Sequence, residues 1–307
     1  MKILVTGGAG FIGSNITDAL CGLGHDVVVA DNLSSGKKAN VNHKAKFYEL
    51  DITDKKAVGE MFMKEKFDIV DHHAAQIDVR KSVADPINDA NINVIGALNL
   101  FENARINGVK KLIFASSGGT IYGECPNEPP DESAEARPLS PYGITKYAVE
   151  FYMKFYQDIH KMNYTVLRYG NVYGPRQDPH GEAGVVAIFS EKMLRREDLN
   201  IFGDGKQNRD YVYVGDVVRA NVKALDRADK EIVNIGTKAA TSVNRLFELM
   251  AEITQYGKKP VYQPARAGEL FNSVLDNKKA AEVLQWKPEV SIKDGLAKTI
   301  EYFRNKS

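Results

Sequence analysis

The sequence predicts an α/β protein with a doubly wound parallel sheet and a smaller C-terminal α/β domain. Short, continuously apolar runs alternate with helical stretches through the first half of the 307 residues. Parallel strands covered on both faces have this pattern, and the helices between them complete repeated βαβ units. A glycine-rich turn follows the first run. We expect residues 1–170 to form the first domain and residues 171–307 the second, interleaved with the first near residues 210–240.

The expected elements follow the order of the chain. Strands cover residues 3–6, 27–31, 46–50, 69–74, 112–116 and 164–168, with weaker candidates at 200–202 and 232–235. In the second half, helical periodicity covers residues 185–195, 217–225, 243–253 and 278–284. Residues 126–141 hold five of the eleven prolines, which predicts a long ordered loop. A second loop, residues 174–181, has the composition of a domain junction or lid.

The composition excludes several classes of protein. Lys plus Arg is 41 and Asp plus Glu is 40, and this balance argues against a nucleic-acid partner. No apolar run approaches the ~18 residues that a membrane span needs, and we expect neither a membrane partner nor a signal peptide. Cys21 and Cys125 are the two cysteines, too few for a disulfide framework, and they suit a reducing cytoplasm. A chain this long needs no structural metal, and no metal site is expected.

Three glycines form a predicted phosphate-binding turn after the first strand. Gly7 allows a tight turn, Gly10 lets a pyrophosphate approach the backbone, and Gly13 lets the next helix pack against the sheet. The start of that helix offers unpaired N–H groups and the positive end of its dipole to an anion. This context predicts a Rossmann-type dinucleotide site rather than a purely structural turn.

Carboxylates at the ends of the next two strands indicate which dinucleotide binds. Asp31 lies 24 residues after the first glycine, where a carboxylate accepts hydrogen bonds from the adenosine ribose and repels a 2′-phosphate. Lys37 and Lys38 could receive such a phosphate, but we expect NAD over NADP. Asp51 and Ile52 end the third strand near the expected adenine, although a simple helix cap explains Asp51 equally well.

A serine and a Tyr–Lys pair form the predicted catalytic group. Ser117 follows the fifth strand, at the edge where open α/β sheets bind ligands. Ser140 is a suitable N-cap and Pro141 a suitable first residue for the next helix. Tyr142 and Lys146 then lie one turn apart on one helix face. Because a cation beside a phenol stabilises the phenolate, Tyr142 is expected to exchange a proton at neutral pH.

The helix over residues 142–159 carries a second prediction. Lys146, Glu150, Lys154 and Asp158 form one polar stripe, and apolar or aromatic residues cover most of the rest. A helix with so much apolar surface is buried on two sides. One side would face the sheet and the other a partner subunit, so we expect a homodimer through this helix and a neighbouring one.

These motifs together resemble the extended short-chain dehydrogenase/reductase family. The resemblance rests on the glycine turn, Asp31, Ser117 and the Tyr142–Lys146 pair, and it covers the whole chain. The stretches 72–76, 168–176, 203–212, 266–269 and 276–280 resemble the family's sugar-nucleotide 4-epimerases. The resemblance implies an NAD-dependent isomerase that interconverts UDP-glucose and UDP-galactose through a transient 4-keto sugar, and that could also take the N-acetylhexosamine pair.

The resemblance also implies which residues contact each ligand. The implied NAD contacts are Gly7, Gly10, Phe11, Ile12, Gly13, Asp31, Asn32, Ser35, Gly36, Asp51, Ile52, Ala74, Ala75, Gln76, Asn93, Tyr142, Lys146 and Tyr169. The implied UDP-sugar contacts are Ser117, Tyr142, Asn171, Val185, Phe202, Arg209, Arg266 and Ser273. Two Arg forks suit a diphosphate and Phe202 offers a uracil ring a flat face. A small residue at Ser273 leaves room for a 2-acetamido group.

Some alternatives remain open at this point. Four residues separate Ser117 from Tyr122, where the best-known epimerases have three, so Ser116 could fill the catalytic hydroxyl role, although we favour Ser117. A sugar-nucleotide 4,6-dehydratase or UDP-glucuronate decarboxylase would carry a carboxylate where this chain has Gly118 and Gly119. Two further hypotheses are a UDP-glucuronate 4-epimerase and a non-catalytic NAD-sensing protein. The intact Tyr–Lys pair disfavours the non-catalytic protein.

Overall fold

The computed structural model describes residues 1–125, 129–180, 184–265 and 270–306. Pro126, Gly181 and Arg266, which the sequence predictions include, lie outside the described residues. Between Tyr122 and Ser140 the described residues form no helix or strand, as the proline content predicts.

In the described part of the chain, seven parallel strands form the central sheet. They are β1 (Lys2–Thr6), β2 (Asp26–Asp31), β3 (Lys46–Glu49), β4 (Ile69–His72), β5 (Lys111–Ser117), β6 (Asn163–Tyr169) and β10 (Glu231–Ile235). Their order is β10-β6-β5-β4-β1-β2-β3, and each neighbouring pair is parallel. The chain reverses its direction of travel between β1 and β4, and ligands bind at such a switch point. The doubly wound Rossmann-type fold is confirmed.

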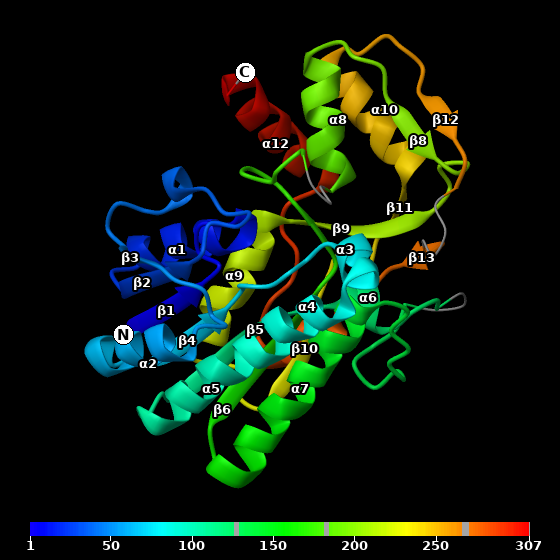
Figure 1. Cartoon of the computed structure of the whole chain (residues 1–307). Coiled ribbons are helices and arrows are strands. Elements are labelled where there is room, and N and C mark those ends of the chain that lie inside the picture. The colour runs from blue at the N-terminus through cyan, green and yellow to red at the C-terminus, as the bar shows by residue number, and fades with distance from the viewer. Residues whose placement is uncertain (126–128, 181–183, 266–269, 307) are drawn as a thin grey trace.

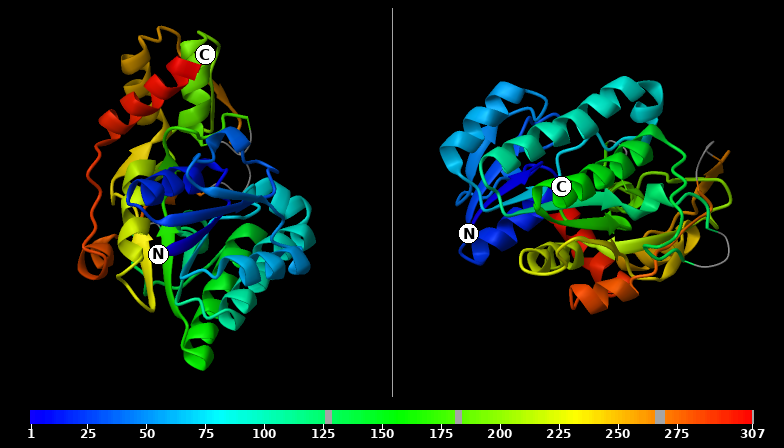
Figure 2. Two further views of the ribbon diagram at one scale, coloured as in Figure 1. Left: turned by 90° about the vertical axis from the view of Figure 1, so that its left-hand side faces the viewer. Right: turned by 90° about the horizontal axis from the view of Figure 1, so that it is seen from below.

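Helices cover both faces of this sheet (Figures 1 and 2). One face carries α2 (Lys55–Glu65), α5 (Gly96–Ile106) and α7 (Pro141–His160), and the other carries α1 (Phe11–Gly22), α9 (Val214–Ala224) and α11 (Lys278–Val283). Alternate strand residues point to opposite faces, so Leu4 packs in the first core and Ile3 in the second. Short helical pieces complete the connections: η1 (Lys38–Asn40), α3 (Val79–Ala84), α4 (Pro86–Ala90), the π-helical turn η2 (Asn91–Ile95) and α6 (Gly118–Ile121).

The C-terminal half builds smaller sheets and a third core. Its strands are β7 (Asn171–Tyr173), β8 (Asn200–Phe202), β9 (Asn208–Tyr213), β11 (Ala240–Ser242), β12 (Val261–Gln263) and β13 (Asn272–Ser273). β9 lies between β11 and β13 and also pairs with β7, while β12 pairs with β8. The helices α8 (Val185–Leu194), α10 (Val243–Thr254) and α12 (Ile292–Lys306) enclose a core that includes Phe189, Leu246 and Ile300.

The two halves of the chain interleave in space. β10 joins the large sheet beside β6, and α9 packs against α1, although both come after residue 170. The division of the chain at residue 170 into two domains stays a prediction. The expected strands and the four helices of the second half form, with shifted ends, whereas β7, β9, β11, β12, β13 and α12 are additions. Among the described residues, no helix is both long and apolar enough to cross a lipid bilayer.

Candidate active site

The phosphate turn lies between β1 and α1, at the carboxyl edge of the sheet. Gly7 has a φ of +68°, and a Cβ on it would lie 2.7 Å from the Ala74 backbone nitrogen. A Cβ on Gly13 would lie 2.4 Å from the Gly7 carbonyl oxygen. Any side chain at either position would therefore collide with the backbone. Gly10 caps α1 without a side-chain hydrogen bond, and the first intrahelical bond is donated by the Ser14 N–H to the Gly10 carbonyl. The N–H groups of the first helical turn before Ser14 are therefore left for an outside acceptor such as a phosphate.

Asp31 joins the end of β2 to this turn. Its carboxylate accepts the Ala9 N–H at 3.0 Å and the Leu33 N–H at 2.8 Å. Each oxygen keeps a further lone pair for a ribose hydroxyl. A Cβ on Gly36 would lie 2.9 Å from Asp31 Oδ1, and the Lys37 N–H bonds to the Ala9 carbonyl at 2.9 Å. The chain after β2 therefore lies directly on the phosphate turn, which fits an adenosine ribose at Asp31.

The adenine end of the predicted site is more open. Asn32 Nδ2 donates to Asp51 Oδ2 at 2.9 Å, and both residues are exposed. Burial opposes ionisation of Asp51, but hydrogen bonds from Thr53 and Asn32 outweigh it and hold its pKa below the usual range. Ile52 is 5% exposed and packs on α5, since a Cβ on Gly96 would lie 2.6 Å from its Cδ1. The Ile52 side chain therefore packs in the core, and its contact with NAD stays a prediction.

The segment after β4 is held by hydrogen bonds to the buried carboxylate of Asp89. β4 ends at His72, two residues before the end of the predicted strand. Beyond it, Gln76 and Asn93 bond to each other through main chain and side chain, at 2.8 and 3.0 Å. Both side-chain amides also donate to Asp89 Oδ1, at 2.8 and 3.1 Å. Asp89 Oδ2 accepts the hydroxyl of Thr145 on α7 at 2.8 Å.

Asp89 is fully buried, so this network ties two predicted NAD contacts to the catalytic helix. The sequence reasoning missed Asp89, because no local pattern shows that Gln76 and Thr145, from two other parts of the chain, join Asn93 around it.

The catalytic helix α7 begins as the sequence predicts. Ser140 is its N-cap and accepts the Gly143 N–H at 3.2 Å, and Pro141 is its first residue. The Tyr142 N–H donates to Ser82 Oγ of α3 at 3.2 Å. Lys146 Nζ lies 5.8 Å from the centre of the Tyr142 ring. The structure therefore brings the predicted pair together on one helix face, close to the end of β5.

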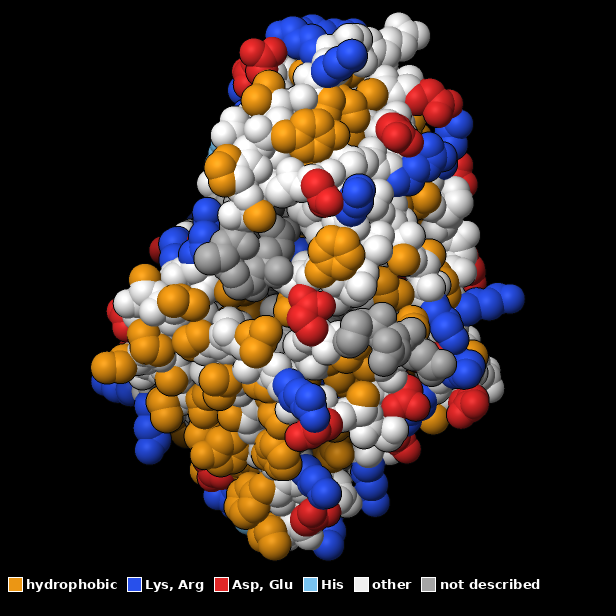
Figure 3. Space-filling model, turned by 90° about the vertical axis from the view of Figure 1, so that its right-hand side faces the viewer, with side chains coloured by type: hydrophobic (Ala, Val, Ile, Leu, Met, Phe, Trp, Pro, Cys, Tyr) orange, Lys and Arg blue, Asp and Glu red, His pale blue; other side chains and the backbone are white. Residues whose placement is uncertain are grey.

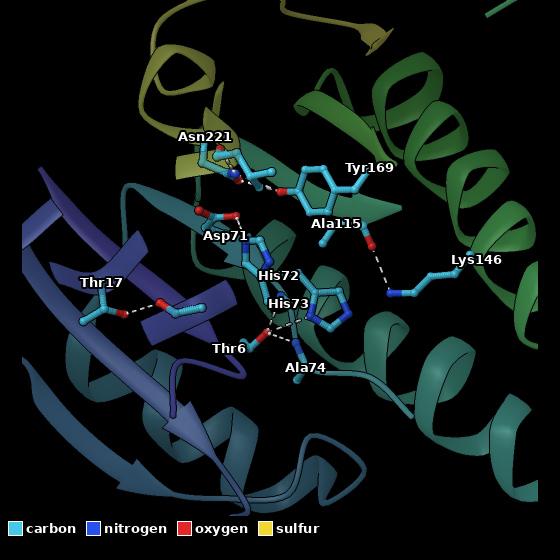
Figure 4. A network of polar contacts seen from close by, with 12 residues as sticks. Thr6, Thr17, Asp71, His72, His73, Ala74, Ala115, Lys146, Tyr169 and Asn221 are labelled. Carbon is cyan, nitrogen blue, oxygen red and sulfur yellow. Dashed lines mark hydrogen bonds and ion pairs between the residues drawn. The ribbon is translucent and has the colours of Figure 1, made fainter. Parts of the chain in front are cut away.

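Lys146 is a buried cation. Its Nζ donates to the Ala115 carbonyl at 2.9 Å (Figure 4). It also lies 4.8 Å from the centre of the Phe114 ring. Burial lowers the pKa of Lys146 to about 8, while the charges of Asp89 and Glu150 act in the opposite direction. The polar stripe predicted on this helix thus faces inward at its first two members, since Lys146 is 4% exposed and Glu150 is 3% exposed.

The two serines at the end of β5 have different environments. Ser116 is buried, and its hydroxyl donates to Glu150 Oε1 at 2.6 Å. The same carboxylate binds Arg168 through two nitrogens, at 3.0 and 2.6 Å. Ser116 therefore belongs to a buried ion-pair network that fixes α7 to the sheet. Ser117 is partly exposed at the strand end, which favours it for the catalytic hydroxyl.

Three predicted substrate contacts converge on one point. A Cβ added to Gly119 would have three polar atoms within 4 Å: Ser273 Oγ at 3.7 Å, Asn171 Oδ1 at 3.9 Å and Ser117 Oγ at 3.9 Å. Asn171 lies on β7 and Ser273 on β13, and both strands pair with β9. Arg209 is the residue of β9 paired with Ser273, and its Nη1 donates to the Asn208 carbonyl at 2.8 Å. The small sheet thus places Asn171 and Ser273, two predicted sugar contacts, close to Ser117.

Tyr169 lies on the opposite side of the sheet edge from Lys146 (Figure 4). It pairs with Ser117 across β5 and β6. Its hydroxyl bonds to the Asn221 side chain, and its ring stacks on His73 with 6.3 Å between ring centres. His73 Nε2 in turn contacts Asp71 at 2.8 Å. The Tyr169 hydroxyl is therefore engaged with Asn221, and the contact of Tyr169 with NAD stays a prediction.

The remaining predicted contacts lie on other segments of the chain. Phe202 ends β8, and its carbonyl accepts Gln207 Nε2 at 2.9 Å. Val185 is the first residue of α8 and Ser35 is exposed after β2. Arg266 lies outside the described residues, so its predicted role at the diphosphate stays a prediction.

The fold and the site together define a class of protein: a dinucleotide-dependent enzyme that removes a hydride from one carbon of its substrate and a proton from the hydroxyl on that carbon. The glycine turn and Asp31 fit NAD, because the structure leaves the turn no room for side chains and orients a carboxylate beside it. Comparison with known proteins is more specific. The model of the NAD dependent epimerase/dehydratase family matches residues 3–236. The chain belongs to this family, and its cofactor is NAD.

Individual relatives, two of them of known structure, match over the full chain. A UDP-glucose 4-epimerase from Thermotoga maritima, solved with UDP-glucose, is 54% identical with a TM-score of 0.99, over 100% of this chain and 99% of that one. A UDP-glucose 4-epimerase from Thermus thermophilus, solved with NAD, is 43% identical with a TM-score of 0.95, over 100% of both chains. A UDP-glucose 4-epimerase from Mycolicibacterium smegmatis is 45% identical over 100% of both sequences.

Proposed function

We propose that this enzyme is an isomerase that interconverts UDP-glucose and UDP-galactose by inverting C4 of the hexose. The observation that carries the proposal is the grouping of Tyr142, Lys146 and Ser117 at one sheet edge, where Asn171 and Ser273 also converge. The full-length similarity to UDP-glucose 4-epimerases supports the same activity. The pathway we propose for it is galactose metabolism.

The chain's own residues would move the proton. NAD, when bound, accepts a hydride from C4 of the sugar and later returns it. The Tyr142 phenolate takes the proton of the 4-hydroxyl and gives it back from the same position. The ammonium of Lys146, one turn away, stabilises that phenolate. Ser117 bridges Tyr142 and the sugar hydroxyl, and Ser116 is unsuited to this because its hydroxyl is engaged with Glu150.

The nucleotide would be held by the C-terminal half while the hexose stays loose. Arg209 on β9, with Arg266, suits the diphosphate, and Phe202 suits the uracil ring. Inversion requires the 4-keto sugar to present its other face, and a firm nucleotide grip with a loosely held sugar allows this. Binding energy from the remote nucleotide is then available to the reaction at C4.

A second acid or base is missing from the described site, which disfavours the alternatives. A 4,6-dehydratase or decarboxylase would need a carboxylate after Ser117. A Cβ on Gly118 would lie 2.5 Å from Leu275 Cδ1, so a carboxylate there would require that core residue to move. The test is incubation with UDP-galactose and, in a parallel sample, with UDP-glucuronate, followed by sugar analysis. UDP-glucose is the expected product, and a 4-keto-6-deoxy sugar or a pentose derivative from UDP-glucuronate would overturn the proposal.

The proposal extends to N-acetylated sugars through Ser273. Its hydroxyl lies beside the Gly119 position shared with Ser117 and Asn171, and its small size leaves room for a 2-acetamido group. Enlarging it with Ser273→Tyr should reduce turnover of UDP-N-acetylglucosamine much more than that of UDP-glucose. Equal loss on both sugars would refute the steric argument.

We also propose a homodimer formed through α7 and the neighbouring α5. On α7, Phe151, Phe155 and Ile159 are 58%, 46% and 64% exposed, and Ile106 at the end of α5 is 68% exposed. Figure 3 shows hydrophobic side chains gathered on the lower part of the molecule. Light scattering at micromolar concentration should give the mass of a dimer, and Phe155→Glu should give a monomer. Val261→Glu, at an exposed apolar residue of β12, is the matched control.

For its location we propose the cytoplasm. Within the described residues, Cys21 and Cys125 are both free thiols, which suits a reducing compartment.

A further inference from the structure

An ordered segment from the substrate half of the chain lies against the cofactor half. Residues 174–180 follow β7, and we call them the crossing segment. Gly174 sets its start, with a φ of +153° and no room for a side chain, since a Cβ would lie 2.4 Å from Val214 Cγ1. Gln177 braces it from inside, because its Nε2 donates to the Val172 carbonyl at 3.1 Å.

The crossing segment is fastened to both segments that border the phosphate turn. Asn15 Nδ2 donates to the Pro175 carbonyl at 3.3 Å and, at 2.8 Å, to the carbonyl of Phe11 at the start of α1. On the other border, Lys37 Nζ lies 3.8 Å from Asp178 Oδ1. The Lys37 N–H itself bonds to the Ala9 carbonyl of the turn. The segment therefore bridges α1 and the chain after β2, which are the two borders of the NAD phosphate site.

The shortest of these contacts is an ion pair. Arg176 Nη2 lies 2.6 Å from Asp18 Oδ2 on α1, and the two side chains are only 25% and 36% exposed. Arg176 adopts a φ of +73°, a left-handed conformation that costs free energy for a residue with a side chain. Its surroundings must compensate for this strain, and the pair with Asp18 is a contact that does so.

We propose that the Arg176–Asp18 ion pair is a latch that holds the crossing segment over the phosphate turn and slows the release of NAD. An enzyme that takes and returns the same hydride gains from a cofactor that stays bound between turnovers. The inference rests on NAD binding alone and does not depend on which sugar is the substrate.

The experiment measures NAD retention rather than activity. The purified holoenzyme, Asp18→Asn, Arg176→Gln and the exchanged pair Asp18→Arg/Arg176→Asp are loaded with radiolabelled NAD. Release is then followed by gel filtration in an excess of unlabelled NAD. Because a half-buried ion pair contributes modestly, each single variant should release label about fivefold faster than the wild type. The exchanged pair should return to within about twofold.

Matched controls separate the latch from a general loss of charge or fold. Arg245→Gln removes the partner of Glu248 on α10, an ion pair of 3.0 Å that involves no residue of the crossing segment, and should leave the release rate unchanged. High salt should speed release from the wild type more than from Arg176→Gln, because salt screens the pair. Wild-type release rates in both single variants would overturn the proposal. So would fast release from the exchanged pair while its circular dichroism and melting temperature match the wild type.

Discussion

Replacing Lys146 by methionine should stabilise the fold while it destroys the activity. Burial lowers the pKa of the Lys146 ammonium from 10.5 to about 8. Each pKa unit corresponds to about 1.4 kcal/mol, so the buried charge costs the folded state about 3 kcal/mol at pH 7. Methionine removes that cost, but it also removes the hydrogen bond to Ala115 and the cation over Phe114. These two losses cost about 1–2 kcal/mol and so offset part of the gain from removing the buried charge.

The expected net change is a gain of about 1–2 kcal/mol in the free energy of unfolding at pH 7. The size of this gain depends on pH between the folded and the unfolded pKa of Lys146. Because the folded pKa lies below the unfolded one, the penalty on the wild type is complete below pH 8 and disappears as the pH rises toward 10.5. By pH 10 the Lys146→Met variant should therefore have lost most of its advantage.

The assay is guanidinium unfolding of NAD-free wild type and Lys146→Met at pH 7 and pH 10. NAD must be removed first, because a bound cofactor stabilises each protein according to its own affinity. Turnover of the variant should fall at least about 100-fold. A variant less stable than the wild type at pH 7, or a stability difference that is the same at both pH values, would refute the reasoning.

Three further predictions follow from other contacts. Tyr142→Phe should lower turnover by about 10²–10⁴-fold while equilibrium dialysis still measures stoichiometric NAD; unchanged turnover would exclude Tyr142 as the acid–base group. Ser117→Ala should lower turnover about 100-fold with an unchanged melting temperature. Ser116→Ala should instead lower the free energy of unfolding by about 1 kcal/mol, because it leaves Glu150 short of one hydrogen-bond donor. The reverse pattern would make Ser116 the catalytic hydroxyl. Burial opposes ionisation of Glu65, but Lys2, Lys46 and Tyr48 bind it and lower its pKa to about 2. Glu65→Gln should therefore cost about 2–3 kcal/mol at pH 7, and this cost should shrink below pH 4.5 as the wild type loses the same interactions; a cost independent of pH would contradict the depressed pKa.

The large sheet was predictable because most of its strands are buried on both faces, although the edge strand β3 is not. Runs such as 112–116 are continuously apolar, and the glycines at 7, 10 and 13 leave little choice of turn. The small sheet was not, because the first half of β9, Asn208–Asp210, is polar and its partners are strands of two or three residues. α12 did carry a signal, with Ile292, Leu296, Ile300 and Phe303 along one helix face.

The candidate site was predictable in its local motifs and not in its long-range contacts. Tyr142 and Lys146 follow from a helix spacing, so the sequence could place them. Neighbouring strand residues such as Ser116 and Ser117 face opposite sides, and only the position of Glu150 shows which hydroxyl is engaged. Asp89 and the Asp18–Arg176 pair depend on partners 56 and 158 residues away, where a single sequence carries no pairing signal.

The most direct test of the proposed chemistry follows one hydrogen atom. UDP-glucose carrying deuterium at C4 is incubated with the holoenzyme in ordinary water, and the UDP-galactose formed is examined by mass spectrometry and NMR. Retention of the deuterium at C4 is the expected result, since the same hydride leaves and returns within one closed site. Loss of the label to water, or its appearance in free dinucleotide, would contradict it.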